Sequence, residues 1–241
     1  MARSTIFFEN LAYELSYEIF APEREKKILI LHGWGASKEL MSGAFGGCLG
    51  GVCQIYLDLP GFGNSSVQRA LQSEDYALIV QEFLRQKKFK IDCFMGHSFG
   101  GKIATLLATQ NKTPLILLSS AGIPVRKSFQ VRLKIALFKR LKILGLGKLW
   151  RLFASKDGAG LSPLMYETFK RVVDEDFRSV FENFSQKALI FWGKEDAATP
   201  LSSGECIHKL ISKSSFHPLD GDHFFFLRHA PHIARIIKKE L

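Results

Sequence analysis

The sequence predicts an α/β fold with a mostly parallel central sheet. Short apolar runs alternate along the chain with stretches whose apolar residues recur at helical spacing, which is typical of parallel strands connected by helices. The chain has 241 residues, 46% of them hydrophobic, so one domain with an insertion can bury a large core. Such a chain needs neither disulfides nor metal ions to fold, and its composition excludes a disordered or collagen-like protein.

The apolar runs place the expected strands and helices. Buried strands are predicted at residues 27–33, 52–61, 91–98, 114–120, 188–193 and 214–219. Helices are predicted at 75–88, where the apolar residues share one face, and at 100–110. The first twenty residues suggest an antiparallel hairpin at one edge of the sheet.

The strand pattern disappears between residues 123 and 183. Within this block, the apolar residues of one predicted helix lie on a single face: Leu133, Leu137, Leu141 and Leu144. More helix is expected around 163–183. Because this all-helical block interrupts a strand pattern, we expect residues 123–183 to form a helical cap on a core made of 1–122 and 184–241.

A serine between glycines lies where a predicted strand meets a predicted helix. GHSFGG, residues 96–101, fits the G-x-S-x-G pattern, in which a sharp turn exposes the serine hydroxyl at the carboxyl end of a strand. Glycine is needed at positions 96 and 100 because the turn brings neighbouring backbones too close for side chains. The helix that follows favours negative charge at the same place. Ser98 is therefore the expected nucleophile, and a structural glycine-rich turn is the alternative.

A serine hydroxyl needs a general base, and the base needs a carboxylate that fixes its tautomer. His223, in a loop near the end of the chain, is the expected base. Asp196 follows a predicted strand and is the expected carboxylate, with Glu195 and Asp222 as rivals.

The other histidines make weaker candidates for the base. His32 follows a predicted strand and is expected to bond to backbone, and His97 is expected to point away from the serine hydroxyl. The remaining histidines are expected at the surface or on helices: His208, His217, His229 and His232.

Two main-chain N–H groups are expected to bind the oxyanion that forms when the serine attacks a carbonyl. One belongs to Phe99, the residue after the nucleophile, and the other to Trp34 in the loop after the first buried strand. The side chains of Trp34 and Phe99 would then form apolar walls of the substrate pocket. Gly33, Ser120 and Phe224 are expected to complete that pocket.

Several motifs, taken in order, resemble the α/β-hydrolase superfamily, and so does the order Ser98, Asp196, His223 along the chain. The motifs are HGWG (32–35), DLPGFGNS (58–65), GHSFGG (96–101), WGKEDAATP (192–200) and GDHF (221–224). HGWG with a helical cap is similar to carboxylesterases such as the pimeloyl-carrier-protein methyl ester esterases. The resemblance implies an α/β-hydrolase fold with a helical cap insertion. It also implies a serine hydrolase that cleaves a carboxylic ester or thioester through an acyl-enzyme, a reaction that requires no metal or organic cofactor.

Departures from neighbouring families narrow the expected chemistry. Haloalkane dehalogenases and epoxide hydrolases have an aspartate where this chain has Ser98, so neither reaction is expected. The meta-cleavage-product hydrolases, which cut carbon–carbon bonds, usually show HGxGPG, and HGWGAS lacks that proline. Carbon–carbon hydrolysis is therefore the weaker alternative, and a non-catalytic ligand-binding member of the fold is another.

The net charge of +10 belongs to one segment. Residues 123–156 contain ten basic side chains and no acidic ones, whereas the rest of the chain has equal numbers of each. A solvated outer face of the cap is the simplest interpretation. The alternatives are a docking surface for an acidic partner, such as an acyl carrier protein, and an anionic membrane surface. Nucleic acid is not expected as a partner, because no recognition motif accompanies the charge.

The N-terminal segment and the cysteines predict a cytoplasmic protein. The first twenty residues carry Glu9 and Glu14 where a signal peptide would have an apolar core. No stretch reaches the roughly 18 consecutive apolar residues of a membrane-spanning helix. The four cysteines are scattered and contain no CxxC pair, so free thiols are expected, with a disulfide between Cys48 and Cys53 as the alternative.

Overall fold

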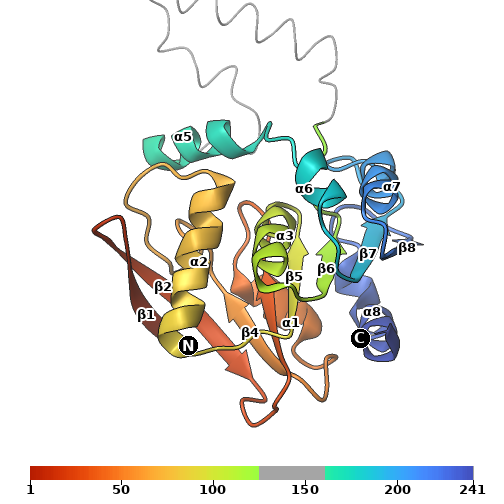
Figure 1. Cartoon of the computed structure of the whole chain (residues 1–241), viewed down its shortest axis with the longest axis horizontal. Helices are drawn as coiled ribbons and strands as arrows, with labels where there is room; N and C mark the ends of the chain where they lie inside the picture. Colours follow the sequence, from red (N-terminus) through yellow and green to blue (C-terminus); the bar gives the residue numbers. More distant parts are fainter. Residues whose placement is uncertain (125–160, 241) are drawn as a thin grey trace, which may run out of the picture.

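The described residues, 1–124 and 161–240 of this computed structural model, contain an eight-stranded sheet. Its strand order is β1-β2-β4-β3-β5-β6-β7-β8 (Figure 1). The strands are β1 Ala2–Phe8, β2 Leu11–Phe20, β3 Lys27–Leu31, β4 Cys53–Leu57, β5 Cys93–His97, β6 Leu115–Leu118, β7 Ala188–Gly193 and β8 Ser214–Leu219. From β4 to β8 in this order all neighbouring strands are parallel, which confirms the predicted fold class.

β1 and β2 form the antiparallel hairpin predicted at the edge of the sheet. Its turn is made by Glu9 and Asn10, whose φ angles of 49° and 60° lie in the left-handed region that two-residue turns between twisted strands require. β2 then pairs antiparallel with β4, where Tyr17 lies opposite Leu57. The hairpin therefore extends the parallel part of the sheet by two strands.

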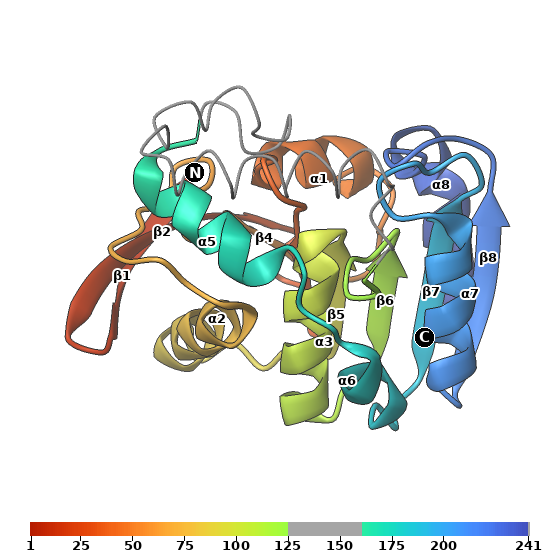
Figure 2. The same ribbon diagram turned by 90° about the horizontal axis from the view of Figure 1, so that it is seen from above.

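Helices cover both faces of the sheet (Figure 2). The helices of one face are α1 Lys38–Phe45 and α8 Phe226–Glu240. The helices of the other face are α2 Ser73–Lys87, α3 Phe99–Asn111, α6 Arg178–Glu182 and α7 Leu201–Leu210. The predicted helices at 75–88 and 100–110 are thus present as α2 and α3.

Each inner strand is buried on both sides, and its side chains alternate between the two faces. In β3, Leu29 and Leu31 belong to the core on the side of α2 and α3, whereas Ile28 and Ile30 belong to the core on the side of α1 and α8. Strands with two buried faces are apolar throughout, which explains why they stand out in the sequence as unbroken apolar runs.

The insertion predicted at 123–183 lies between β6 and β7. Its described part contains α5 Pro163–Val172 and α6, so the helix expected around 163–183 is present. Ser162 caps α5, because its hydroxyl oxygen accepts a hydrogen bond from the Met165 N–H at 3.2 Å. The predicted leucine stripe and the ten basic residues of the cap lie outside the described residues.

The four cysteines, Cys48, Cys53, Cys93 and Cys206, are free thiols, so Cys48 and Cys53 do not form a disulfide. Burial raises the pKa of the Cys53 and Cys93 thiols, which keeps both protonated at neutral pH. Within the described ranges, we find no helix that is both long and apolar enough to cross a bilayer.

Candidate active site

Ser98 lies on a sharp turn between β5 and α3. Its backbone has φ 50° and ψ −116°, a conformation that non-glycine residues rarely adopt. The Ser98 N–H donates to the Leu118 carbonyl, and the Ser98 carbonyl accepts from the N–H groups of Gly101 and Ala121, each at 3.0 Å. These hydrogen bonds maintain the strained turn and hold Ser98 at the wall of a cavity.

The glycines around Ser98 let three segments approach one another closely. A Cβ on Gly96 would overlap the carbonyl of Gly100, and a Cβ on Gly100 would overlap the carbonyl of His32. These approaches explain why the motif requires glycine at both positions. They also bring the loop after β3, which carries Trp34, directly against the start of α3.

His223 and Asp196 form a hydrogen-bonded pair, with 2.7 Å between His223 Nδ1 and Asp196 Oδ2. Asp196 follows β7 and is buried, and its Oδ1 accepts from the N–H groups of Ala198 at 2.8 Å and Thr199 at 2.9 Å. Burial by itself raises the pKa of Asp196, but the hydrogen bond and charge of His223, together with the Thr199 N–H, hold that pKa below its ordinary value. The carboxylate therefore stays ionised and favours a proton on His223 Nδ1.

Thr199 is a member of this cluster that the sequence analysis missed. Its Oγ1 lies 2.9 Å from Asp196 Oδ2 and 3.3 Å from His223 Nδ1, and it lies 3.2 Å from the Ser119 carbonyl oxygen. The hydroxyl thus helps to fix the carboxylate oxygen that faces the imidazole. The available signal was a threonine three residues after the aspartate, at the spacing of a side-chain-capped turn.

The rival carboxylates bind to the backbone of the same loop. Glu195 accepts a hydrogen bond from the Gly221 N–H, and Asp222 Oδ1 accepts one from the Phe224 N–H at 2.8 Å. Both carboxylates therefore shape the loop that carries His223, while Asp196 is the one bonded to its ring.

His32 has the structural role that the sequence predicts. Its Nε2 accepts a hydrogen bond from the Leu59 N–H at 3.0 Å, so Nδ1 carries the proton and donates to the Gly33 carbonyl at 2.8 Å. Burial lowers the pKa of His32 and keeps the ring neutral. His32 thus ties the loop after β3 to the loop after β4.

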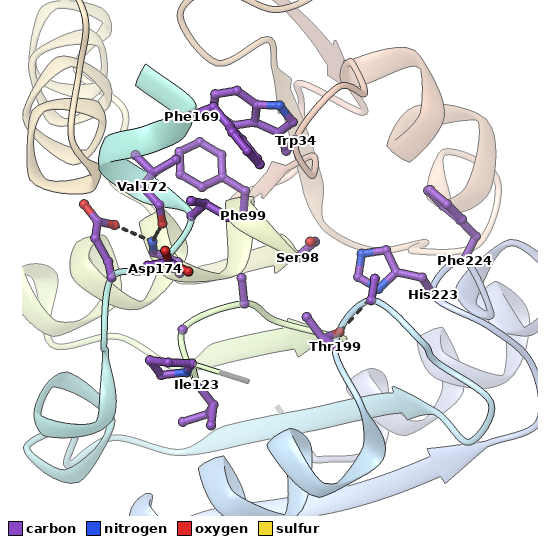
Figure 3. A pocket seen from close by; sticks show the side chains of 17 residues that line it. Trp34, Ser98, Phe99, Ile123, Phe169, Val172, Asp174, Thr199, His223 and Phe224 are labelled. Carbon is purple, nitrogen blue, oxygen red and sulfur yellow. Dashed lines mark hydrogen bonds and ion pairs between the residues drawn. The ribbon is translucent and has the colours of Figure 1, made fainter. Parts of the chain in front are cut away.

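A cavity of about 460 Å³ is bordered by Ser98 and His223 (Figure 3). Core and insertion both contribute to its wall. Its apolar lining residues include Trp34, Phe99, Ala121, Ile123, Phe169, Val172, Val173 and Phe224. The nucleophile and base expected from the sequence therefore share one cavity, whose wall is apolar at these residues and charged at Lys102, Asp174 and Glu175.

Three of the five residues expected to line the substrate pocket border this cavity, namely Trp34, Phe99 and Phe224. Gly33 and Ser120, which were also expected in the pocket, are not part of the cavity lining formed by the described residues. Gly33 lies against the His97 ring and the Cβ of Ser98, and Ser120 is buried against Gly101. Both residues are closely packed among their neighbours at these positions.

Trp34 and Phe99, the residues expected to supply the oxyanion hole, form an aromatic wall together with Phe169 of α5. The Trp34 ring centroid lies 5.4 Å from that of Phe99 and 5.3 Å from that of Phe169. Phe99 is the first residue of α3, so its N–H has no acceptor within the helix. Both expected oxyanion residues therefore border the cavity, and the Phe99 amide lies at a helix N-terminus.

A buried ion pair that the sequence did not reveal joins α3 to the insertion. The Lys102 ammonium donates to the Val172 carbonyl at 2.8 Å and to the Glu175 carboxylate, and Glu175 in turn accepts from the N–H and hydroxyl of Ser73. Lys102 meets the C-terminus of α5 and Glu175 meets the N-terminus of α2, so each charge faces the favourable end of a helix dipole. The cluster fixes the end of α5, and thereby Phe169, beside the cavity.

Comparison with known proteins agrees with this architecture. A curated relative, the pimeloyl-[acyl-carrier protein] methyl ester esterase of Neisseria meningitidis serogroup B / serotype 15 (strain H44/76), is 22% identical over 244 residues, covering 90% of this chain and 93% of the relative. Among solved structures, a bromoperoxidase from Bacillus anthracis is 20% identical with a TM-score of 0.77 and 99% of both chains covered. A thermophilic esterase from Thermogutta terrifontis is 18% identical with a TM-score of 0.74, covering 99% of this chain and 97% of that one.

At these identities the solved structures show a shared fold, because one fold carries many chemistries. The model of the alpha/beta hydrolase family matches residues 28–232, which is most of the chain. That match includes the turn at Ser98, Asp196 after β7 and His223 in the loop after β8. The chain belongs to the alpha/beta hydrolase family.

Proposed function

We propose that this chain is a serine hydrolase that cleaves a carboxylic ester or thioester, with Ser98 as nucleophile, His223 as general base and Asp196 as the carboxylate that orients the base. The observation that carries the proposal is the 2.7 Å contact between His223 Nδ1 and Asp196 Oδ2, beside a cavity that Ser98 also borders. A protein that only binds a ligand needs neither a strained serine turn nor an ionised carboxylate behind a histidine.

The first half of the proposed reaction forms an acyl-enzyme. Ser98 Oγ bonds to the carbonyl carbon of the ester while its proton passes to His223 Nε2. The carbonyl oxygen becomes an oxyanion that the N–H groups of Trp34 and Phe99 bind, and one such donor lowers the barrier by on the order of 3 kcal/mol. His223 then gives the proton to the departing alcohol or thiol, and the acyl group stays on the serine.

The second half releases the acid. Water gives a proton to His223 Nε2 as its oxygen bonds to the acyl carbon, and the Ser98 oxygen leaves and takes that proton back. Asp196 acts through His223 in both halves, because it keeps the Nδ1 proton in place and stabilises the imidazolium. In this mechanism, side chains of the protein transfer each proton, and main-chain amides together with Asp196 stabilise each charge that forms.

The substrate class that we propose is an acyl ester presented by an acidic carrier protein. The name of the curated relative gives an acyl-carrier-protein methyl ester as its substrate, and the alignment covers 93% of that relative. The basic segment 123–156 would attract an acidic carrier and speed its encounter with the enzyme. The apolar part of the cavity beside Ser98, formed by Trp34, Phe99 and Phe169 among others, is suited to an acyl chain.

Hydrolysis of p-nitrophenyl butanoate tests the triad. We expect Ser98→Ala to lower kcat by at least about three orders of magnitude, because the nucleophile is lost, while the circular dichroism spectrum and melting temperature stay near the wild-type values. Ser120→Ala, at a buried serine outside the cavity lining, is the matched control and keeps most of the activity. Comparable turnover by wild type and Ser98→Ala would refute the proposed mechanism.

The carrier is tested by the salt dependence of kcat/KM. For an acyl ester on an acyl carrier protein we expect kcat/KM to fall as salt rises from 20 to 500 mM, whereas kcat/KM for p-nitrophenyl butanoate stays nearly constant. Equal salt responses of the two substrates would exclude electrostatic steering by the basic segment. Co-flotation with anionic vesicles, together with equal salt responses, would assign the basic segment to a membrane surface instead.

A further inference from the structure

Resting on the proposed function, we propose that His97 is a positioning residue that holds the main chain of His223 in place relative to Ser98. From its place in the motif, His97 was a weaker candidate for the base, because it is expected to point away from the serine hydroxyl. Its ring instead connects β5, which ends next to Ser98, with the loop that carries His223.

The His97 side chain lies in a closely packed ring cluster. His97 is the last residue of β5 and only 1% exposed. Its ring centroid lies 4.6 Å from that of His223, 4.8 Å from that of Phe226 and 5.5 Å from that of Phe224. Three of the residues that follow β8 are therefore packed around a side chain that is covalently adjacent to Ser98.

The His97 ring makes one hydrogen bond within this cluster. His97 Nε2 lies 3.0 Å from the main-chain carbonyl oxygen of His223. Because a carbonyl only accepts, Nε2 must carry the proton and Nδ1 must be bare. His97 Nδ1 is buried without a hydrogen-bond partner among the described residues, and a Cβ on Gly33 would approach it to 2.8 Å. Among the described residues, the hydrogen bond to the His223 carbonyl is therefore the one that orients the His97 ring.

The hydrogen bond fixes His223 at the end opposite its bond to Asp196. The ring of His223 is held through Nδ1 by Asp196, and its main chain is held by His97. The neighbouring residues are bonded elsewhere, since the Gly221 carbonyl accepts from the Glu195 N–H at 3.0 Å. The main chain of His223 is thus held to the residue that precedes Ser98, and its ring is held to Asp196.

A positioning residue here must also stay uncharged, because His223 becomes an imidazolium during the reaction. Burial, followed by the neighbouring His223, lowers the pKa of His97 to about 3. The His97 ring is therefore neutral at any working pH. It holds the His223 backbone without adding a second positive charge 4.6 Å from the ring that has to accept the proton.

Two variants separate the hydrogen bond from the packing. His97→Phe keeps an aromatic ring but removes the donor, and His97→Gln places an amide N–H near the position of Nε2. Phe226→Leu is the matched control, because it removes packing against His97 and leaves the hydrogen bond in place. The readouts are kcat and KM for p-nitrophenyl butanoate, and hydrogen–deuterium exchange of residues 219–227.

We expect His97→Phe to lower kcat by about tenfold to 100-fold with KM within twofold of wild type, because the base is misplaced but the cavity is not. Residues 219–227 should exchange faster, and His97→Gln should restore most of both readouts. Wild-type kcat and exchange in His97→Phe would overturn the proposal. Equal losses in Phe226→Leu and His97→Phe would also overturn it, because packing alone would then explain the effect.

The exchange readout separates this proposal from the proposed function. Turnover that survives in Ser98→Ala would refute the triad, whereas exchange of residues 219–227 reports the hydrogen bond whether or not the protein hydrolyses esters. Faster exchange in His97→Phe but not in Phe226→Leu supports the positioning role in either case.

Discussion

Asp196 is buried among hydrogen-bond donors, all of which require an ionised carboxylate as acceptor. Its two oxygens receive hydrogen bonds from two main-chain N–H groups, the Thr199 hydroxyl and the His223 ring. An amide in its place would present an NH₂ group to one or more of these donors. The site therefore depends on the charge of this side chain as well as on its shape.

Asp196→Asn tests that dependence. We expect kcat for p-nitrophenyl butanoate to fall by about three to four orders of magnitude, because the asparagine favours the wrong His223 tautomer and does not stabilise the imidazolium. Asp222→Asn, at an exposed carboxylate bonded to the loop backbone, is the control and keeps activity within a few-fold. Equal effects of the two substitutions would show that Asp196 is not the orienting carboxylate.

For single residues of the candidate site, the sequence predicts those that belong to a motif. It does not predict those that come together only in the folded chain. Ser98 was predictable because a strained turn requires glycines at fixed spacing around it. Lys102 was not predictable, because a lysine in a helix carries no local signal, and Thr199 was marked only by its spacing of three residues from the aspartate. Gly33 and Ser120 lie outside the cavity lining formed by the described residues, and adjacency to the site in sequence does not tell on which side of the wall a residue packs.

At the scale of the elements, a polar contact holds α5 to the core. It lies over the cavity with Phe169 against Trp34, and its C-terminal end is held by Lys102 and Glu175. The Lys102 side chain is 2% exposed and that of Glu175 is 20% exposed. A charge buried to this extent is stable only with its partner, so removal of one partner costs far more than removal of both.

Lys102→Met should therefore lower the free energy of unfolding by about 3–5 kcal/mol, because it leaves the Glu175 carboxylate partly buried without its cation. The double variant Lys102→Met with Glu175→Gln should recover part of that loss. Urea denaturation measures both, with Arg85→Ala at an exposed ion pair as the control that changes little. Additive losses in the double variant would show that the two residues do not act as a pair.

The elements themselves were predictable where burial is strongest. β3, β5 and β7 are buried on both faces, so each appears in the sequence as an unbroken apolar run. Helices were expected between β6 and β7 because the helical pattern there interrupts the strands, and α5 and α6 are present in the described part of that segment. The contacts of α5 with the core were not predictable, because they depend on where two distant helices end in space.

For the whole molecule, the two histidines buried in the core couple stability to pH. Burial lowers the pKa of His32 and His97, the latter to about 3, whereas an unfolded histidine has a pKa of about 6.5. Below pH 6.5 these histidines bind protons in the unfolded chain but not in the folded protein. The stabilisation is therefore present above that pH and is lost as the pH falls toward 3.

We expect the free energy of unfolding to fall by about 2 kcal/mol as the pH is lowered from 7.5 to 5, owing to His97 alone. The pH dependence of urea denaturation should be correspondingly shallower in His97→Gln than in wild type. Parallel pH profiles for the two proteins would contradict a neutral, buried His97.

The most direct test of the account is the covalent labelling of the nucleophile. Incubation with a fluorophosphonate, followed by intact-mass measurement and peptide mapping, should give one phosphonyl group on Ser98, with release of fluoride. The adduct should be absent in Ser98→Ala and form much more slowly in His223→Ala. An unmodified wild-type protein, or an adduct on another residue, would contradict the assignment of Ser98 as the activated serine.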